Sequence, residues 1–197
     1  MIVKFTDSEK QRLEMYCKRH KLKINGFIAR GHSARIFLVQ KGRKKFVAKL
    51  ERDDSPRENM LEKEAFYLKL ANSIKVGPKL VAYDFHFRVL IMEFIEGKTL
   101  NQWLKGKRTK KELKKFFDEL LKQAERLDEL GLDHGQLAGR GVNILVKKGK
   151  HPKPIIIDFE KASVERKVHN RSVLEAFIGR NKALKKLKIE TKLKKRE

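Results

Sequence analysis

Two short apolar segments in the second half of the chain each carry an oxygen-bearing side chain at one end. Asn143 precedes Ile144–Val146, and Asp158 follows Ile155–Ile157. If the two segments pair as strands around a turn at 147–154, the amide and the carboxylate come to one end of a hairpin. Both groups offer the oxygen ligands that Mg²⁺ takes on nucleotide phosphates. The pattern predicts that Asn143 and Asp158 bind Mg²⁺, although Asp158 alone is also typical of a turn or cap.

A loop just upstream, His134-Gly135-Gln136, supplies the polar groups for the other side of such a site. Gln136 can orient a hydroxyl group or a water molecule, but it cannot accept a proton at neutral pH. Asp133 is therefore the candidate for the group that accepts the proton. The alternative is that Asp133 points away from the site. His134 is expected to form structural hydrogen bonds rather than to act as a base.

Lys49 lies in an apolar segment of the first half of the chain, where burying an unpaired ammonium group would be costly. A strand lysine of this kind binds nucleotide phosphates when a helix carboxylate orients it. The following helix offers three candidates for that carboxylate. Glu64 is favoured and Glu62 is second, whereas Glu58 lies nearer the helix N-terminus, where carboxylates often serve the helix dipole.

Gly31 and Ser33 lie between two apolar stretches that read as strands. Small residues at this place let a loop cover phosphates with its backbone N–H groups. Gly31 is the only glycine of this stretch, and Ala29 and Ala34 are small residues on either side of it. An ordinary hairpin turn is the alternative interpretation.

These side chains need elements to position them, and the hydrophobic pattern predicts an α+β chain. The first half reads as β-β-α-β-β on a small antiparallel sheet that follows a short N-terminal helix. The second half reads as mainly helical with one hairpin, and the only plausible hinge lies near Glu93–Gly97. The expected helices are 8–20, 56–71, 99–104, 109–130 and 171–177, and the expected strands are 27–39, 46–50, 80–83, 89–92, 143–146 and 155–158.

The charge of the chain predicts a polyanionic partner. Lys and Arg number 49 against 25 Asp and Glu, a formal net charge of +24. RNA or a ribosome is expected ahead of a membrane, partly through a basic tail at 181–197 that could form an amphipathic helix or a frayed terminus. A lysine-rich heat-stable surface is the alternative, but such surfaces usually add glutamate too. The single Cys17 and the lack of an apolar run of membrane-spanning length predict a cytoplasmic protein.

From Ile28 to about Ser163, the order of these parts resembles the protein-kinase-like superfamily. The chain is similar to minimal atypical kinases such as the RIO kinases and the small kinase of the tRNA-modification complex. It most resembles predicted archaeal serine/threonine protein kinases with an Asp-His-Gly-Glu/Gln-Leu loop, here Asp133–Leu137. Each motif alone is weak, but their order is specific.

The resemblance implies a two-lobed kinase-like fold that binds ATP and Mg²⁺. It implies an N-lobe at 1–93 with an antiparallel sheet and a helix, a reduced, mainly helical C-lobe at 94–180, and the tail. Lys49 would hold phosphates, with Glu64 orienting it, and Gly31 and Ser33 would belong to the glycine loop. Met92 would be the gatekeeper, and backbone groups of Glu93 to Ile95 would bind the adenine. The adenine pocket would be lined by Ile28, Ile36, Ala48 and Leu145. Plain core packing is the alternative interpretation of these four residues.

Three departures from the family pattern concern the catalytic loop and the metal segment. Gln136 stands where related enzymes have the catalytic aspartate, and Asn143 follows it by seven residues instead of five. Glu160 replaces the glycine of the usual Asp-Phe-Gly. The resemblance implies an ATP- and Mg²⁺-dependent phosphotransferase, an atypical serine/threonine protein kinase with a non-standard catalytic loop that acts on a protein substrate. A pseudokinase that binds ATP and RNA or a ribosome is the alternative, and a small-molecule kinase ranks last.

Overall fold

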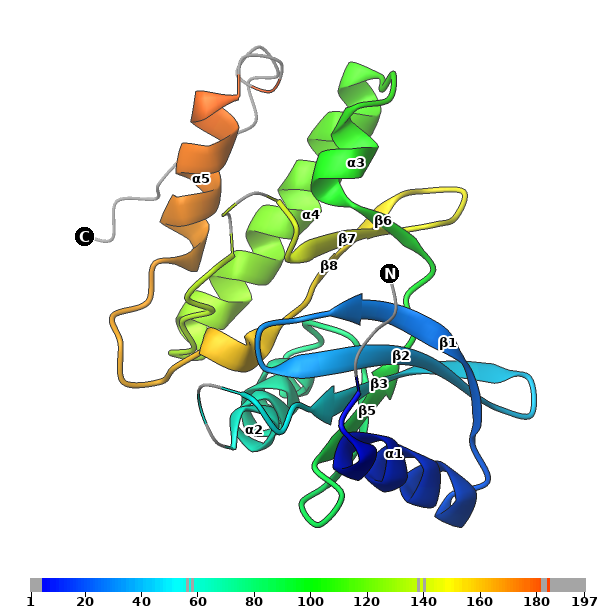
Figure 1. The fold of residues 1–197 in the computed structure, drawn as a ribbon. Helices are drawn as coiled ribbons and strands as arrows, with labels where there is room; N and C mark the ends of the chain where they lie inside the picture. Colours follow the sequence, from blue (N-terminus) through cyan, green and yellow to red (C-terminus); the bar gives the residue numbers. More distant parts are fainter. Residues whose placement is uncertain are drawn as a thin grey trace. The chain divides into compact units, whose positions relative to one another are not determined.

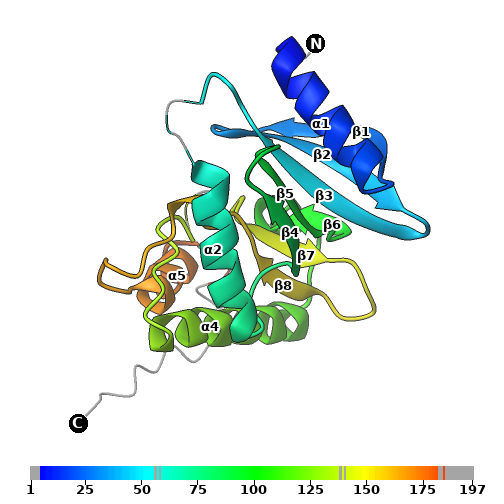
Figure 2. The same ribbon diagram turned by 90° about the horizontal axis from the view of Figure 1, so that it is seen from below.

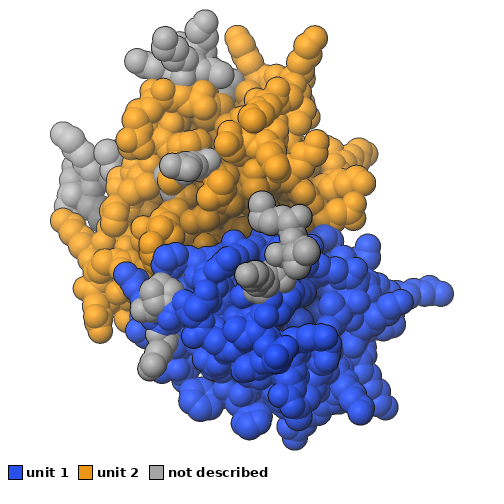
Figure 3. All heavy atoms as spheres, in the orientation of Figure 1, with its two compact units in different colours: residues 1–72, 78–94 blue, residues 73–77, 95–197 orange. Residues whose placement is uncertain are grey.

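The computed structural model of the protein describes residues 5–55, 57, 59–137, 139, 141–181 and 184. The chain divides into two compact units, residues 1–72 with 78–94 and residues 73–77 with 95–197 (Figure 3). The first unit holds an antiparallel sheet and two helices, and the second holds most of the helices. The predicted α+β class is confirmed, with features consistent with a two-lobed kinase-like fold. The predicted domain limits stay a prediction.

The sheet of the first unit has five antiparallel strands in the order β1-β2-β3-β5-β4 (Figure 1). The sequence predicts four strands here, one fewer than the structure has. The apolar run at 27–39 was expected as one strand, but it contains the turn at Gly31–Ser33 and forms parts of β1 and β2. The strands are β1 (Lys23–Arg30), β2 (Ala34–Lys41), β3 (Lys44–Glu51), β4 (Leu80–Asp84) and β5 (Val89–Glu93).

Each face of this sheet packs against one helix of the unit, α1 (Asp7–Arg19) or α2 (Met60–Ser73). Leu13 and Tyr16 of α1 lie in a buried apolar cluster with Ala48 and Leu50 of β3. The alternation of a strand sends the residues between them to the other face, where Lys49 meets α2. Figure 2 shows the two helices apart, and α1 contacts β1 and β3.

Local capping explains where the helices of the first unit begin. Thr6 and Glu9 form a capping box at α1, the start predicted from the sequence. Helix α2 begins at Met60, later than predicted, and Pro56 lies outside the described residues. The buried carboxylate of Glu51 accepts a hydrogen bond from the backbone N–H of Leu61 (3.2 Å), in the first turn of α2. The sheet thereby holds the helix that carries Glu64.

The second unit combines helices with a three-stranded sheet in the order β6-β7-β8. Strand β6 was not predicted, because it has only three residues; Gly97 lies in it so close to β7 that an added Cβ would meet the Val146 carbonyl oxygen at 2.2 Å. The elements are β6 (Gly97–Thr99), α3 (Leu100–Leu104), α4 (Lys110–Glu129), β7 (Ile144–Lys147), β8 (Lys153–Ile156), the 3-10 helix η1 (Phe159–Lys161) and α5 (Asn170–Arg180).

Helix α4 supplies the core of the second unit, as its apolar spacing predicts. Thr109 and Glu112 form its capping box, and its buried face packs on β8 and α5. Within the described residues, no helix is both long enough and apolar enough to cross a membrane. Apart from Asn181 and Leu184, the predicted basic tail at 181–197 lies outside the described residues.

Candidate active site

Lys49 and Glu64 form a buried ion pair in the first unit. The Lys49 Nζ donates to both carboxylate oxygens of Glu64, at 2.6 and 2.8 Å, and the two side chains are 11% and 1% exposed. Glu62, the second candidate, is exposed, and Glu58 lies outside the described residues. Lys49 and Glu64 are therefore paired as the sequence predicts, while their roles toward a nucleotide stay a prediction.

The neighbours of Lys49 on its sheet face differ from those expected. Ile36 and Leu90 pair with Lys49 across the strands and share its face. Ala48 instead points into the core beneath α1 and has no exposed surface. Because side chains alternate along a strand, Val47 rather than Ala48 shares the Lys49 face. This corrects the predicted place of Ala48 in an adenine pocket.

The turn with Gly31 and Ser33 is held in shape by an arginine that the sequence did not reveal. Arg52 donates to the carbonyl oxygens of Gly31 (3.2 Å) and His32 (2.7 Å), and its backbone N–H donates to Ser33. The side-chain hydrogen bonds to Asp54 raise the pKa of Arg52, so the group that holds the turn is a cation. This clamp orders the loop, whereas Ile28 beside it is 47% exposed on β1.

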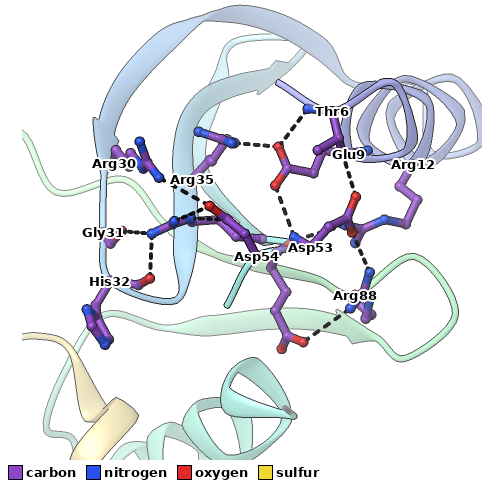
Figure 4. A network of polar contacts seen from close by, with 12 residues as sticks. Thr6, Glu9, Arg12, Arg30, Gly31, His32, Arg35, Asp53, Asp54 and Arg88 are labelled. Atoms are coloured by element: carbon purple, nitrogen blue, oxygen red, sulfur yellow. Dashed lines mark hydrogen bonds and ion pairs between the residues drawn. The ribbon is translucent and has the colours of Figure 1, made fainter. Parts of the chain in front are cut away.

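A second buried ion pair of the first unit has a structural task. Glu9 of α1 accepts from the Arg35 Nε at 2.6 Å, and both side chains are buried. The same carboxylate accepts from the backbone N–H groups of Thr6 (3.3 Å) and Asp53 (3.0 Å), as Figure 4 shows. Glu9 therefore ties α1 to β2 and to the segment after β3, which supports the strand that carries Lys49.

The predicted hinge begins at the end of β5. Met92 is buried, and the Glu93 backbone N–H donates to the Lys79 carbonyl oxygen at 2.8 Å. Among the described residues we find no hydrogen bond to the backbone of Ile95, which is the first residue of the second unit's main segment. The backbone of Ile95 can thus pair with a ligand, as the hinge prediction requires. Leu145 lies half-buried on β7, also in the second unit.

The second unit contains a cavity of about 580 Å³ that gathers the residues expected to act on the acceptor. Asp133, Gln136, Asn143 and Asp158 all line it, and so does His169, which the sequence did not single out. Gly135 allows this crowding: its φ is +77°, and an added Cβ would meet Arg166 and Lys161 at 2.5 Å. Three sequence-distant segments therefore meet around one space.

His134 is locked as a neutral structural residue. Its Nε2 contacts the Ile157 carbonyl oxygen (3.0 Å), and its Nδ1 accepts from the Gln136 backbone N–H (3.4 Å). Its ring packs edge-on against Phe159, with centroids 4.9 Å apart. Burial lowers the pKa of His134, with opposing contributions from the Ile157 carbonyl and nearby carboxylates. His134 thereby connects the catalytic-type loop to the segment that ends in Asp158.

Asn143 and Asp158 fit a metal ion that is shared with a nucleotide. The Asn143 amide nitrogen donates to the Gln136 carbonyl oxygen at 3.0 Å, which leaves its side-chain oxygen for a ligand. Asp158 has a left-handed backbone with φ +71°, a conformation that aspartate tolerates better than most residues. The described residues contain no cluster of three His, Cys, Asp or Glu side chains suited to a metal. Two protein oxygens match Mg²⁺, which takes its other ligands from phosphates and water.

Asp133 and Gln136 line the same cavity but differ in exposure and in side-chain contacts. Gln136 is exposed, whereas the Asp133 side chain is only 2% exposed and is held by Arg166 and His169. Backbone hydrogen bonds between Asp133 and Ser163, at 2.8 and 2.9 Å, fix the position of Asp133. Asp133 thus faces the cavity, but its carboxylate is already committed to two cationic or polar partners.

Comparison with protein families agrees with this architecture. Residues 3–186 match the RIO domain, so the chain belongs to the RIO family, a family of atypical protein kinases in the protein-kinase-like superfamily. Use of ATP and a divalent metal is a general property that this membership implies. No curated protein matches the chain.

Proposed function

We propose that the chain is an ATP- and Mg²⁺-dependent phosphotransferase whose acceptor is a serine or threonine hydroxyl group of a protein. The convergence of Gln136, Asn143 and Asp158 on one cavity carries this proposal. The buried pair of Lys49 and Glu64 supports it, because phosphotransferases of this superfamily need a lysine that is oriented by a carboxylate.

Each side chain has a defined task in the proposed reaction. Lys49 binds phosphate oxygens, and Glu64 holds the ammonium group in place. Asn143 and Asp158 hold the metal, which when bound neutralises charge on the phosphates. Gln136 orients the acceptor hydroxyl through a hydrogen bond without accepting its proton. Since phosphoryl transfer passes through a loose transition state, positioning of this kind supplies most of the catalysis.

The test is calorimetric titration of the purified chain with Mg²⁺-ATP, followed by transfer from γ-labelled ATP to itself or to added protein. We expect saturable binding by the wild type and loss of label transfer in Asp158→Ala. Asp118→Ala is a matched control, because Asp118 lies on α4 in a surface ion pair with Lys114. Transfer that Asp158→Ala leaves unchanged would refute the proposal.

A second candidate function is binding of RNA or a ribosome, which the net charge of +24 favours. It would make the chain a basic binding module, with or without turnover. Binding should then fall steeply as salt rises, survive Lys49→Ala and Asp158→Ala, and weaken on removal of residues 181–197. Absence of RNA binding at physiological salt excludes this candidate.

A further inference from the structure

A buried carboxylate beside the catalytic-type loop holds a histidine at the edge of the cavity. The Asp133 Oδ1 lies 3.2 Å from the His169 Nδ1, and its Oδ2 accepts from the Arg166 Nε at 2.9 Å. Asp133 is 2% exposed, whereas the His169 side chain is 54% exposed. Each carboxylate oxygen of Asp133 therefore has its own partner. The His169 ring is half-exposed and lines the cavity, whereas Asp133 is buried behind it.

The surroundings of the ring decide which nitrogen carries the proton. Nδ1 of His169 lies near two oxygen atoms that can only accept, the Lys167 carbonyl at 3.0 Å and the Asp133 carboxylate at 3.2 Å. The proton of the neutral ring therefore resides on Nδ1, and Nε2 keeps its lone pair. Within the described residues, Nε2 has no hydrogen-bond partner. His134 differs, because both its nitrogens are engaged.

The start of α5 holds this ring in place. His169 is the residue that precedes α5. The Asp128 carboxylate accepts from the backbone N–H groups of Asn170 (2.9 Å) and Arg171 (3.0 Å), which fixes that end of the helix.

We propose that His169 is the general base of the phosphotransfer reaction and that Asp133 is its positioning residue, an inference that rests on the proposed function. Nε2 accepts the proton of the acceptor hydroxyl group as its oxygen forms a bond to the γ-phosphorus. The bond from that phosphorus to the bridging oxygen breaks, and ADP leaves with the electron pair. The imidazolium then releases its proton to water. His169 thereby takes the task that Gln136 cannot perform.

The first experiment compares label transfer in the wild type, His169→Ala and the matched control His151→Ala, which changes an exposed histidine in the β7–β8 turn. General bases contribute about 10²- to 10⁴-fold, and a loose transition state favours the lower end, so we expect His169→Ala to lower kcat about 100-fold. The KM for ATP should stay near the wild-type value, and imidazole added to the buffer should restore part of kcat.

Two further readouts separate a base from a structural tether. The pH profile of kcat should differ between the wild type and His169→Ala, because a base must be unprotonated before it can accept the proton of the acceptor. Nitrogen NMR of the wild-type ring should show the proton on Nδ1, and Asp133→Asn should change that signal. Unchanged kcat in His169→Ala, or a loss with neither imidazole rescue nor a changed pH profile, overturns the inference. Failure of the wild type to bind Mg²⁺-ATP refutes the proposed function instead.

Discussion

Two buried carboxylates, Glu64 in the first unit and Asp133 in the second, are held in different ways. Glu64 pairs with Lys49, whose side chain is 11% exposed, whereas Asp133 pairs with Arg166 and His169, which are 49% and 54% exposed. A partner with little access to water cannot be exchanged cheaply, but a half-exposed partner can. The Lys49–Glu64 pair is therefore a permanent contact, whereas the partners of the Asp133 carboxylate can change.

The largest effect is expected from breaking the permanent pair. Glu64→Ala leaves the Lys49 ammonium group buried without its carboxylate, which should lower the free energy of unfolding by about 3–5 kcal/mol. Urea denaturation measures this change, and Glu62→Ala on the exposed side of α2 should have almost none.

Replacing both partners separates stability from binding at this pair. Lys49→Met with Glu64→Leu should regain most of the stability, because apolar residues of similar volume pack well there. Calorimetry should still find no binding of Mg²⁺-ATP by this double variant. If the double variant binds the nucleotide like the wild type, the pair has only a structural role.

A substitution at Asp133, whose partners can change, should lower the free energy of unfolding less than Glu64→Ala does. Asp133→Asn keeps the shape of the side chain but loses charge-assisted hydrogen bonds to partners that water can solvate. We expect a loss of about 1.5 kcal/mol in the free energy of unfolding, the lower end for hydrogen bonds to charged groups. Urea denaturation of this variant beside Glu64→Ala tests the comparison directly; equal losses would show that the two carboxylates are held alike.

His134 gives the second unit an acid sensitivity. Burial lowers its pKa below the ordinary 6.5, so below that pH the unfolded chain binds a proton that the folded chain does not. The free energy of unfolding should therefore fall with decreasing pH by up to about 1.4 kcal/mol per pH unit from this group. His134→Gln should lack this contribution between pH 6.5 and 5, whereas His151→Gln should keep it. Identical slopes in all three proteins would contradict the assignment.

The smallest effect is expected from restoring the family's aspartate. Gln136 is exposed, so Gln136→Asp should change the free energy of unfolding by less than about 0.5 kcal/mol. With His169 acting as base, the added carboxylate should change the wild-type kcat less than about tenfold. The same substitution should raise the kcat of His169→Ala by a larger factor. A large rise in the wild type alone would show that the acceptor side lacks a base.

The sequence reveals those predicted site residues that their immediate neighbours mark as unusual. Lys49 stands out because a charged residue interrupts an apolar strand, and Asn143 and Asp158 stand out because they end apolar segments. Ala48 was misplaced because the side-chain period of a strand is two residues, so an error of one residue exchanges the faces. The fold could be predicted from hydrophobic periodicity and helix caps, except for the three-residue β6 and the turn that divides the run at 27–39 between β1 and β2.

Other parts of the site have no local signal. Arg52, Arg166 and His169 gain their importance from partners that lie 20, 33 and 36 residues away. A sequence as rich in Lys and Arg as this one hides two such arginines among many others. The contacts of Glu9 with Arg35 and of Asp128 with α5 have no local signal either, because only the fold brings those residues together.

The turn after Asp158 bears on how such a protein can be regulated. Glu160 replaces the glycine that usually follows Asp-Phe, and it lies in η1, whose Phe159 is buried against the ring of His134. A residue with a Cβ has far fewer backbone conformations than glycine, so the joint on which a metal-binding aspartate could swing in and out is stiff. Reorientation of this segment therefore costs more than it would with a glycine at position 160, whereas release of Asp133 from its two exposed partners costs less.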